Sequence, residues 1–297
     1  GDIIRKLPDS FVEIETDEDN NVYINCLNSK FKIKGDSAKE YPQIPDVNED
    51  KLYSIPQDVL KSMIKQTVFA TSQDQTKPIL MGELLEIENG NINLVAIDGY
   101  RFAVRSCQVD NLIHEDLKAK IIIPGKTLID VNSLLSSEEE VKVGFNEKNA
   151  IFIINDTKIV TRLLEGEFID YKKLCPREYN SKIKLKTKDL LNSIERASLL
   201  SQSEQNNLIK LSIRDSMMAI TSNNEKGNVY EEVSLSLEGD YLDIAFNSRY
   251  LLEGLKNIDC EEIYIEFTTN VNPCIIKPAD GTKYTYLLLP VRISSNN

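Results

Sequence analysis

The chain has 297 residues, of which 41% are hydrophobic, so it is long and apolar enough to form two or three domains with buried cores. Its 35 basic and 47 acidic residues give a net charge of −12, which excludes a protein that coats DNA through overall basicity. We find no apolar run of about 18 residues and no signal peptide, and therefore expect a soluble intracellular protein.

The first 50 residues contain a short helix, predicted at residues 2–8, and a hairpin with strands at 11–15 and 22–26. The strands show the period of two that is typical of a half-buried sheet, and a polar turn joins them. The same unit recurs twice further along the chain. Its later copies occupy residues 127–154 and 249–277.

A second unit alternates with the first and occurs twice. It opens with a helix at 54–70, where Pro56 stands in the first turn, and continues with strands at 80–87 and 93–97. The sequence Glu-Asn-Gly-Asn between these strands predicts a tight hairpin. The second occurrence covers residues 183–222 and again contains one helix and a pair of strands.

One copy of each unit makes one domain, in which two helices pack on antiparallel sheet, so the fold class is α+β. We predict the second half of a first domain at 1–50, a second domain at 51–178 and a third domain at 179–297. Residues 1–50 hold only one of the two units. Half a sheet exposes an apolar face and an unpaired edge, so we expect the chain to lack the first half of its N-terminal domain.

The cysteines and the histidine form no recognisable site. The cysteines stand singly and are interpreted as small buried hydrophobic residues of a reducing compartment: Cys26, Cys107, Cys175, Cys260 and Cys274. His114 lies in a polar stretch without zinc ligands or a nucleophilic serine nearby, and is interpreted as a solvated loop residue. We therefore expect no metal, no cofactor and no catalytic residue.

Three further segments carry more specific information. Residues 96–103, Ala-Ile-Asp-Gly-Tyr-Arg-Phe-Ala, form a strand that turns at Asp-Gly and restarts around an arginine. Residues 167–176 form a linker of aromatic, acidic and basic residues, and residues 286–293 form an apolar strand that a proline interrupts. Taken singly, these segments are also compatible with a hairpin turn, an interdomain connection and an edge strand.

Together, in this order and on this repeat, the three segments closely resemble the bacterial sliding clamp, the β subunit of DNA polymerase III. The resemblance covers the whole chain. It implies the DNA clamp fold and a non-catalytic processivity factor, in which two chains of three domains form a homodimeric ring around duplex DNA. It also implies a cytoplasmic, nucleoid-associated protein that docks peptides of the polymerase, the clamp loader and repair proteins.

The resemblance further implies a hydrophobic peptide-binding pocket between the second and third domains. Its residues are expected to be Leu80, Ile97, Gly99, Tyr100, Arg101, Phe102, Leu174, Asn247, Tyr250, Leu287, Leu289, Pro290, Val291 and Arg292. Leucine and phenylalanine side chains of a peptide gain about 2 kcal/mol each on burial, and Arg101 and Arg292 are expected to hold its oxygens. The chain departs from the family at Ile169, where members often have proline.

Two other surfaces follow from the resemblance. Basic residues on the helices that line the hole are expected to be Lys61, Lys65, Lys126, Lys188, Arg196, Arg249 and Lys256. Acidic residues interrupt them, so ordinary solvated helix faces are an equally weighted alternative. Ring closure is expected to bring residues of an edge strand, Lys30, Phe31 and Ile33, against Leu199 and Leu200 of the other chain.

Two other functions remain open from the sequence. A hydrolase that uses paired carboxylates is suggested only by the many acidic residues, and no spacing selects a pair. An acidic scaffold with the same fold, which never encircles DNA, would differ from a clamp in its failure to become linked to nicked circular DNA.

Overall fold

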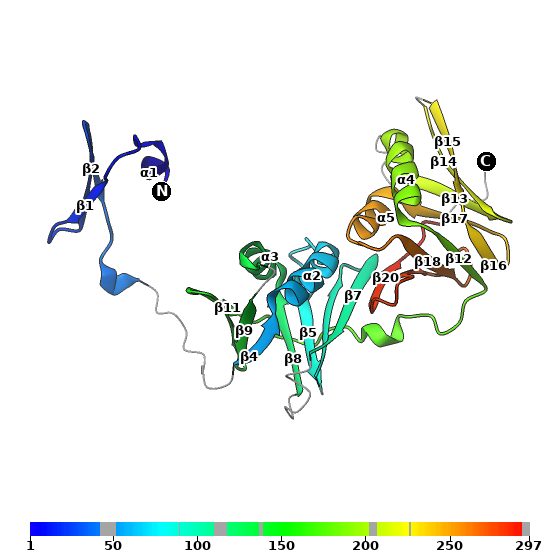
Figure 1. Ribbon diagram of the computed structural model, residues 1–297, viewed down its shortest axis with the longest axis horizontal. Helices are drawn as coiled ribbons and strands as arrows, with labels where there is room; N and C mark the ends of the chain where they lie inside the picture. Colours follow the sequence, from blue (N-terminus) through cyan, green and yellow to red (C-terminus); the bar gives the residue numbers. More distant parts are fainter. Residues whose placement is uncertain are drawn as a thin grey trace. The chain divides into compact units, whose positions relative to one another are not determined.

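The structure is a computed structural model, and it describes residues 1–41, 52–88, 90–109, 118–136, 139–201, 207–225 and 227–292. His114 and Ile293 lie outside these ranges. The chain divides into two compact units, Gly1–Asp46 and Val47–Asn297, each of which is described by itself (Figure 1). No helix within the described ranges has the length and apolarity that a membrane crossing requires.

The described part of the first unit contains one short α-helix, a 3-10 helix at Ala38–Glu40 and a three-stranded antiparallel sheet in the order β1-β2-β3. Its elements are α1 (Asp2–Lys6), β1 (Glu13–Thr16), β2 (Asn21–Cys26) and β3 (Ser29–Lys34). The predicted helix and hairpin are therefore confirmed, and β3 adds a third strand. Ile24 and Cys26 are buried, whereas Phe11 is 98% exposed, so this sheet covers few of its own apolar side chains.

The second compact unit, Val47–Asn297, contains the last two copies of the helix and hairpin repeat and both copies of the other repeat. Its helices are α2 (Gln57–Thr67), α3 (Gly125–Leu134), α4 (Thr187–Ser201) and α5 (Ser248–Leu255). Its strands are β4 (Tyr53–Pro56), β5 (Gly82–Glu88), β6 (Asn91–Ile97), β7 (Arg101–Gln108), β8 (Lys118–Pro124), β9 (Glu140–Phe145), β10 (Asn149–Ile154), β11 (Thr157–Arg162), β12 (Ser181–Lys186), β13 (Leu208–Arg214), β14 (Met217–Asn224), β15 (Gly227–Ser234), β16 (Ser236–Gly239), β17 (Leu242–Asn247), β18 (Glu262–Phe267), β19 (Cys274–Pro278) and β20 (Tyr284–Leu288).

These strands form three antiparallel sheets. Two have four strands, in the orders β11-β10-β9-β4 and β15-β14-β13-β17, and the third has nine, in the order β16-β12-β18-β19-β20-β7-β6-β5-β8. The nine-stranded sheet is continuous because β20, the last strand of the chain, pairs with β7 through residues Tyr284–Leu288 and Arg101–Arg105. One strand pairing thus joins the two repeats along their edges.

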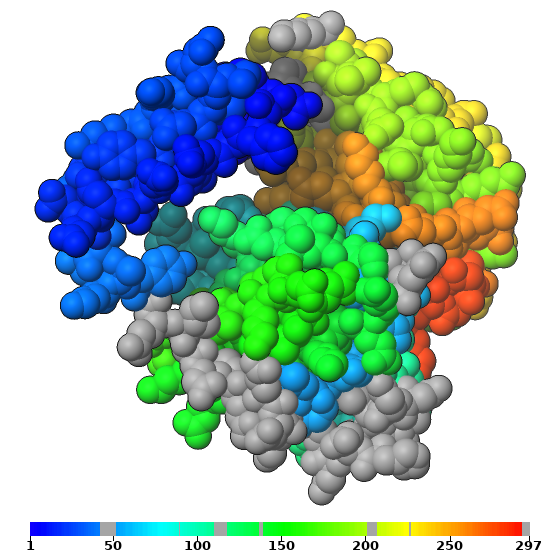
Figure 2. Space-filling model, turned by 60° about the vertical axis from the view of Figure 1, so that its left-hand side comes forward, coloured from blue at the N-terminus to red at the C-terminus, as the bar shows by residue number. Residues whose placement is uncertain are grey.

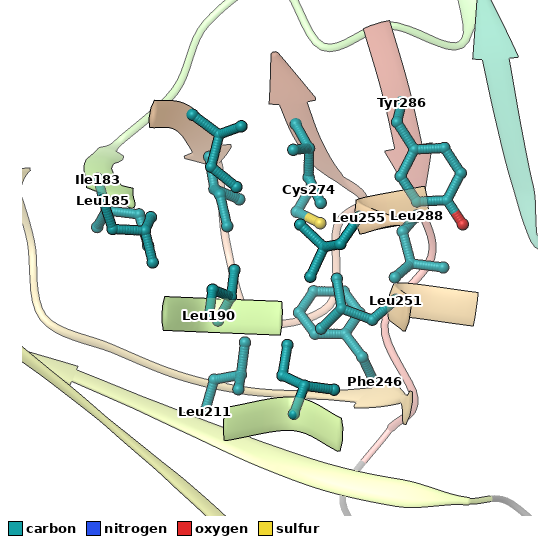
Figure 3. Close-up of a cluster of buried hydrophobic side chains, with 14 of the residues drawn as sticks. Ile183, Leu185, Leu190, Leu211, Phe246, Leu251, Leu255, Cys274, Tyr286 and Leu288 are labelled. Atoms are coloured by element: carbon teal, nitrogen blue, oxygen red, sulfur yellow. The ribbon is translucent and has the colours of Figure 1, made fainter. Parts of the chain in front are cut away.

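Each pair of helices covers the core of one repeat. In α4, Leu190, Ile194 and Ala197 are fully buried, and their spacing of four and three residues places them on one helix face. This face packs with Leu251 and Leu255 of α5 over the sheets, as the close-up of the core shows (Figure 3). Leu60, Met63 and Ile64 of α2 and Leu128 and Val131 of α3 bury the corresponding face of the other repeat.

The strand predicted at residues 286–293 is interrupted before its proline, as expected. β20 stops at Leu288, because Pro290 has no N–H group to donate to a ladder. Beyond it the chain turns away, and the Val291 N–H donates to the Ala245 carbonyl oxygen of β17 at 2.8 Å. The final described residues are therefore held by two different strands.

A carboxyl group lies in the core of the first repeat of this unit. Glu83 of β5 is 0% exposed, and neither of its oxygens accepts a hydrogen bond from any residue that the structure describes. The hydroxyl of Thr67 in α2 donates its proton to the Met63 carbonyl oxygen at 2.8 Å. Burial disfavours the carboxylate and raises the pKa of Glu83 to about 8, so the neutral acid is the stable form in the fold at pH 7.

This burial predicts a pH-dependent stability. Between the ordinary pKa of 4.5 and the raised value of about 8, the folded state binds the proton that the unfolded state releases. The contribution of Glu83 is therefore complete below 4.5 and is lost as the pH rises through 8, at about 1.4 kcal/mol per pH unit. We expect the free energy of unfolding of Glu83→Gln, measured relative to that of the natural chain, to increase by this amount for each unit by which the pH rises. Urea titrations at pH 5, 6, 7 and 8 measure this difference.

The matched control is Glu88→Gln, on the same strand, because the Glu88 side chain is 61% exposed. It should follow the pH dependence of the natural chain. Parallel curves for the natural chain and Glu83→Gln would contradict the prediction.

Candidate functional site

The turn between β6 and β7 meets the end of β20. Gly99 has φ +96, which favours glycine, and the Asp98 carboxylate accepts hydrogen bonds from the backbone N–H groups of Tyr100 and Arg101 at 2.9 and 3.1 Å. The Tyr100 carbonyl oxygen in turn accepts a hydrogen bond from the Leu289 N–H at 2.9 Å. A backbone hydrogen bond therefore joins two segments that lie about 190 residues apart in the sequence.

One face of the nine-stranded sheet carries an apolar cluster at this junction. Four of the residues that we predicted for the pocket belong to it and are buried: Leu80, Ile97, Phe102 and Leu287. Tyr171 of the linker and Ile275 of β19 complete its centre, and the rings of Phe102 and Tyr171 meet edge to face with centroids 6.4 Å apart. The linker thus packs on the seam between the two repeats.

Six other predicted pocket residues are less buried than this cluster, since Pro290 and Val291 are half-buried and the rest are exposed. We call them the rim: Tyr100, Leu174, Leu289, Pro290, Val291 and Arg292. Tyr100 is 60%, Leu174 43% and Leu289 39% exposed, although all three are large apolar side chains. Leu174 stands between Tyr171 and Cys175, both of which contact the cluster. Arg292 is exposed at the end of the described chain. The rim therefore combines accessible apolar surface with one cation.

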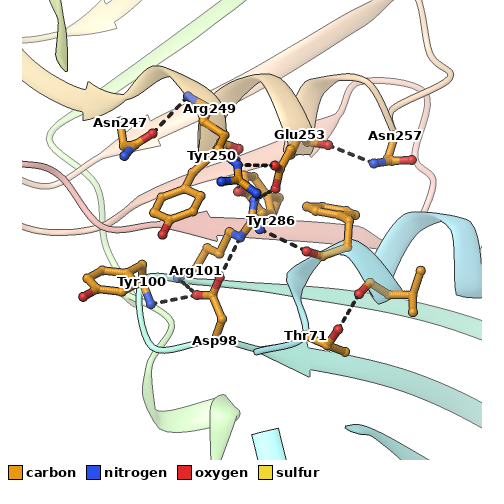
Figure 4. Close-up of polar contacts among 12 residues, drawn as sticks. Thr71, Asp98, Tyr100, Arg101, Asn247, Arg249, Tyr250, Glu253, Asn257 and Tyr286 are labelled. Carbon is orange, nitrogen blue, oxygen red and sulfur yellow. Dashed lines mark hydrogen bonds and ion pairs between the residues drawn. The ribbon is translucent and has the colours of Figure 1, made fainter. Parts of the chain in front are cut away.

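Arg101 lies on the opposite face of the sheet from its neighbour Phe102, because successive side chains of a strand alternate. Its guanidinium forms ion pairs with Asp98 at 2.9 Å and Glu253 at 2.6 Å, and donates to the Phe69 carbonyl oxygen at 3.0 Å (Figure 4). The side chain is 5% exposed. Its donors are used inside the protein, so we correct the expectation that Arg101 is available to hold the oxygens of a peptide.

We call Asp98, Arg101, Tyr250, Glu253 and Tyr286 the joint, since they connect β7 with α5 and β20. The Arg101 guanidinium lies 4.5 Å from the centroid of the Tyr250 ring, and Tyr250 stacks on Tyr100 at 5.8 Å. Burial acts against the charged form of Arg101, but Tyr286, Asp98 and Glu253 together raise its pKa above the ordinary value. The joint therefore keeps a permanent buried charge beside the rim.

Helix α5 is positioned for this contact by its cap and by a glycine. Asn247 caps the helix through a hydrogen bond that its side chain accepts from the Arg249 N–H at 3.0 Å. A Cβ atom on Gly254 would lie 2.3 Å from the Tyr286 ring, so only glycine allows α5 to approach β20 this closely. The Tyr286 hydroxyl completes the contact by donating to the Tyr250 carbonyl oxygen at 2.8 Å.

Glu253 was not predicted, and it holds two arginines. One oxygen pairs with Arg101 and the other with Arg249 at 2.8 Å. Although burial works against the carboxylate, the hydrogen bond from Arg249 and the charge of Arg101 hold the pKa of Glu253 below its ordinary value. The spacing of four residues between Arg249 and Glu253 is the sequence signal for the exposed pair. No local signal reveals the long-range pair with Arg101.

Most of the basic residues predicted for a DNA channel have partners in the fold. Lys61 donates to the Leu135 carbonyl oxygen, and the ion pairs are Lys65–Asp259, Arg196–Glu231, Arg249–Glu253 and Lys256–Glu195. In the space-filling view, the atoms of α4 lie beside those of α5, which agrees with the last of these pairs (Figure 2). Lys126 and Lys188 are exposed, and within the described part of the chain neither forms an ion pair.

The residues predicted for ring closure lie in both units. Phe31 and Ile33 are 39% and 42% exposed, and together with Lys30 they belong to β3, an edge strand of its sheet. Leu199, near the end of α4, is 72% exposed, and Leu200 is half-buried. Apolar side chains are therefore accessible at both predicted surfaces.

A second polar group that the sequence did not reveal lies on β5 and holds the linker. The Glu86 carboxylate is 6% exposed, accepts a hydrogen bond from the Tyr171 hydroxyl at 2.6 Å, and pairs with Lys120 at 2.9 Å and Lys172 at 3.5 Å. These residues and Ile169 line a hollow of about 340 Å³ beside the linker. The network holds Tyr171 and Lys172 of the linker against β5.

Comparison with known proteins gives one consistent result. The family models for the N-terminal, central and C-terminal domains of the DNA polymerase III β subunit match residues 1–45, 54–170 and 172–292. The β sliding clamps of Staphylococcus epidermidis and Staphylococcus aureus are each 36% identical over 294 residues, which is 98% of this chain and 77% of theirs. The solved sliding clamp of Bacillus subtilis aligns with a TM-score of 0.93 and 35% identity, over 99% of this chain and 78% of that one.

The fold and these matches define a non-catalytic accessory protein of DNA replication, built on the α+β clamp fold. The chain belongs to the bacterial β sliding clamp family, the processivity factors of DNA polymerase III. DNA and a polymerase are accordingly its general partners.

The joint predicts a large difference between its two arginines. Arg101→Met removes the buried cation and leaves Asp98 and Glu253 without it, and we expect a loss of about 3 kcal/mol in the free energy of unfolding. Arg249→Met removes a cation that pairs with the same carboxylate but is 72% exposed, and should cost less than about 1 kcal/mol. Urea titrations at pH 7 measure both values, and equal losses would show that burial does not govern the joint.

Proposed function

We propose that the chain acts as a ring-forming clamp that encircles duplex DNA without sequence preference and docks polymerase, clamp-loader and repair proteins through short peptides. In this proposal residues 1–50 are the second half of domain 1, residues 51–178 are domain 2 and residues 179–297 are domain 3. A protein bound to chromosomal DNA belongs at the nucleoid, in the cytoplasm. The supporting observation is the bond between Tyr100 and Leu289, which brings the predicted pocket segments together.

The proposed pocket lies between domains 2 and 3, on the apolar cluster and its rim. Guest leucine and phenylalanine side chains bury against Tyr100, Leu174 and Leu289, and gain about 2 kcal/mol each from the removal of apolar surface from water. Arg292 supplies a charge for a carboxylate or carbonyl oxygen of the guest. The buried members of the predicted set, Leu80, Ile97, Phe102 and Leu287, form the wall behind the guest residues.

Contact with DNA in this proposal is loose. Lys126 and Lys188 are exposed and form no ion pair within the described residues, so they are the readiest to meet phosphates, whereas Lys65, Arg196, Arg249 and Lys256 first exchange an acidic partner. Each such exchange weakens the net attraction. A closed ring stays on DNA by topology, and weak contacts let it slide.

Closure of the ring in this proposal pairs two chains. Phe31 and Ile33 of one chain pack against Leu199 and Leu200 of the other, so that exposed apolar side chains at both surfaces leave water. The lysine-rich strand β3, with Lys30, Lys32 and Lys34, meets a carboxylate-bearing surface of α4 and β15.

The pocket is tested by Leu289→Ala combined with Arg292→Ala. The double variant removes an apolar contact and the exposed cation of the rim, and we expect peptide affinity to fall at least tenfold while the melting temperature stays constant. Isothermal titration calorimetry with a short peptide that carries leucine and phenylalanine anchors measures this affinity. Val271→Ala, which alters a 57% exposed apolar residue outside the rim, is the control. Unchanged affinity in the double variant would remove the pocket from its proposed place.

Encirclement is tested on plasmid DNA. When a clamp loader places the chain on a nicked circle, we expect it to stay with the DNA in gel filtration in high salt and to be released when the plasmid is cut to a linear form. Leu199→Asp puts a charge on the apolar surface that closes the ring and should lower retention on the circle. An acidic scaffold would elute apart from the circle from the start, and retention after linearisation would indicate simple charge attraction.

A further inference from the structure

One carboxylate connects an exposed arginine with a buried one. Oε1 of Glu253 pairs with Nε of Arg249 at 2.8 Å, and Oε2 pairs with Nη1 of Arg101 at 2.6 Å. The Arg249 side chain is 72% exposed and the Arg101 side chain 5%. Any ligand that attracts Arg249 therefore changes the electrostatic surroundings of a charge that water does not reach.

From Arg101 the contacts continue to the rim without a gap. Arg101 pairs with Asp98, the same residue whose carboxylate holds the turn at Tyr100. The guanidinium also lies 4.5 Å from the centroid of the Tyr250 ring, on which Tyr100 stacks. Arg249 at the start of α5 and Tyr100 at the rim are thus linked by ion pairs and ring contacts alone (Figure 4).

We propose that Glu253 couples the DNA-binding surface to the peptide-binding rim: a phosphate that binds Arg249 releases Glu253, which then holds Arg101 more tightly and strengthens peptide binding. This inference rests on the proposed function, since it assigns a regulatory link between the proposed DNA-binding surface and the proposed peptide-binding pocket. Glu253 is a positioning residue in this scheme, because it touches neither DNA nor peptide.

The direction of the effect follows from competition for one anion. While both arginines share Glu253, each reduces the attraction that the other feels. Arg249 leaves at little cost, because an exposed ion pair contributes little in water, whereas the buried pair with Arg101 gains more in its surroundings of lower dielectric constant. A firmly held Arg101 keeps Tyr250 under Tyr100, so the rim is ordered before the peptide arrives and less entropy is lost on binding.

Thermodynamic linkage makes the coupling reciprocal, so a bound peptide tightens DNA binding by the same factor. We expect a factor of about five, at the lower end of typical couplings, because the ion pair between Arg249 and Glu253 is exposed and is screened by salt. Raising the salt concentration should remove the coupling before it removes peptide binding.

The test uses the whole chain and a fluorescein-labelled peptide with leucine and phenylalanine anchors. Fluorescence anisotropy gives the peptide dissociation constant without DNA and with a saturating short duplex oligonucleotide at low salt. The natural chain should bind the peptide about fivefold more tightly with the duplex present. Peptide added at saturation should tighten binding of a labelled duplex by the same factor.

Two substitutions locate the coupling, and a third is a control. Arg249→Gln frees Glu253 permanently, so it should bind the peptide about fivefold more tightly without DNA and gain nothing from the duplex. Glu253→Gln should bind the peptide more weakly and also ignore the duplex. Arg214→Gln removes the same charge from a residue that pairs with Asp243 instead, and should behave like the natural chain.

Each outcome decides between the two proposals. If the natural chain binds the peptide equally well with and without duplex, and Arg249→Gln matches it, the coupling is overturned while the pocket stands. If Arg214→Gln tightens peptide binding as much as Arg249→Gln, overall charge rather than Glu253 is responsible, and the coupling is again overturned. If the natural chain binds no peptide, the proposed function and the coupling both fail. Arg249→Gln carries the test even if Glu253→Gln folds poorly.

Discussion

The pairing of β7 with β20 is the contact on which the rest of the second unit depends. It converts the outer sheets of two repeats into one sheet of nine strands, and it satisfies the backbone N–H and C=O groups of two edges that would otherwise be open. Because side chains alternate along β7, this one pairing produces two different sites. Phe102 contributes to an apolar cluster on one face, and Arg101 contributes to a buried charge network on the other.

The joint shows how a buried charge can give geometry rather than net stability. A buried ion pair recovers little more than the cost of removing its charges from water. The hydrogen bonds of Arg101 to the turn and to the segment after α2 require defined directions, however, and its ion pair holds α5 to the same guanidinium. An apolar residue of similar volume could fill the space, but it would not fix the angle between the repeats. The rim lies next to the joint, because Tyr100 stacks on Tyr250.

Much of the fold could be predicted from the sequence, because the signals are local. The alternation of residues 141–145 and 263–267 indicated strands, and the first-turn Pro56 with apolar residues spaced three and four apart indicated the helix at 54–70. The meeting of Tyr100 with Leu289 came from the resemblance to a family, since no local pattern encodes a contact over such a distance. The roles of Glu253 and Glu86 could not be predicted, because an acidic residue reads as solvated until its partners are known. The end of β20 was predictable, because Pro290 cannot donate to a strand ladder.

The close approach of α5 to β20 restricts how this surface can change over time. The ring of Tyr286 occupies the space that any side chain at position 254 would need, while its hydroxyl anchors the helix at Tyr250. Gly254 is therefore fixed by Tyr286, and a larger residue at 254 becomes tolerable only after the tyrosine has been replaced by a smaller residue. Substitutions at these two positions must occur in that order, so lineages that keep the tyrosine are bound to keep the glycine as well.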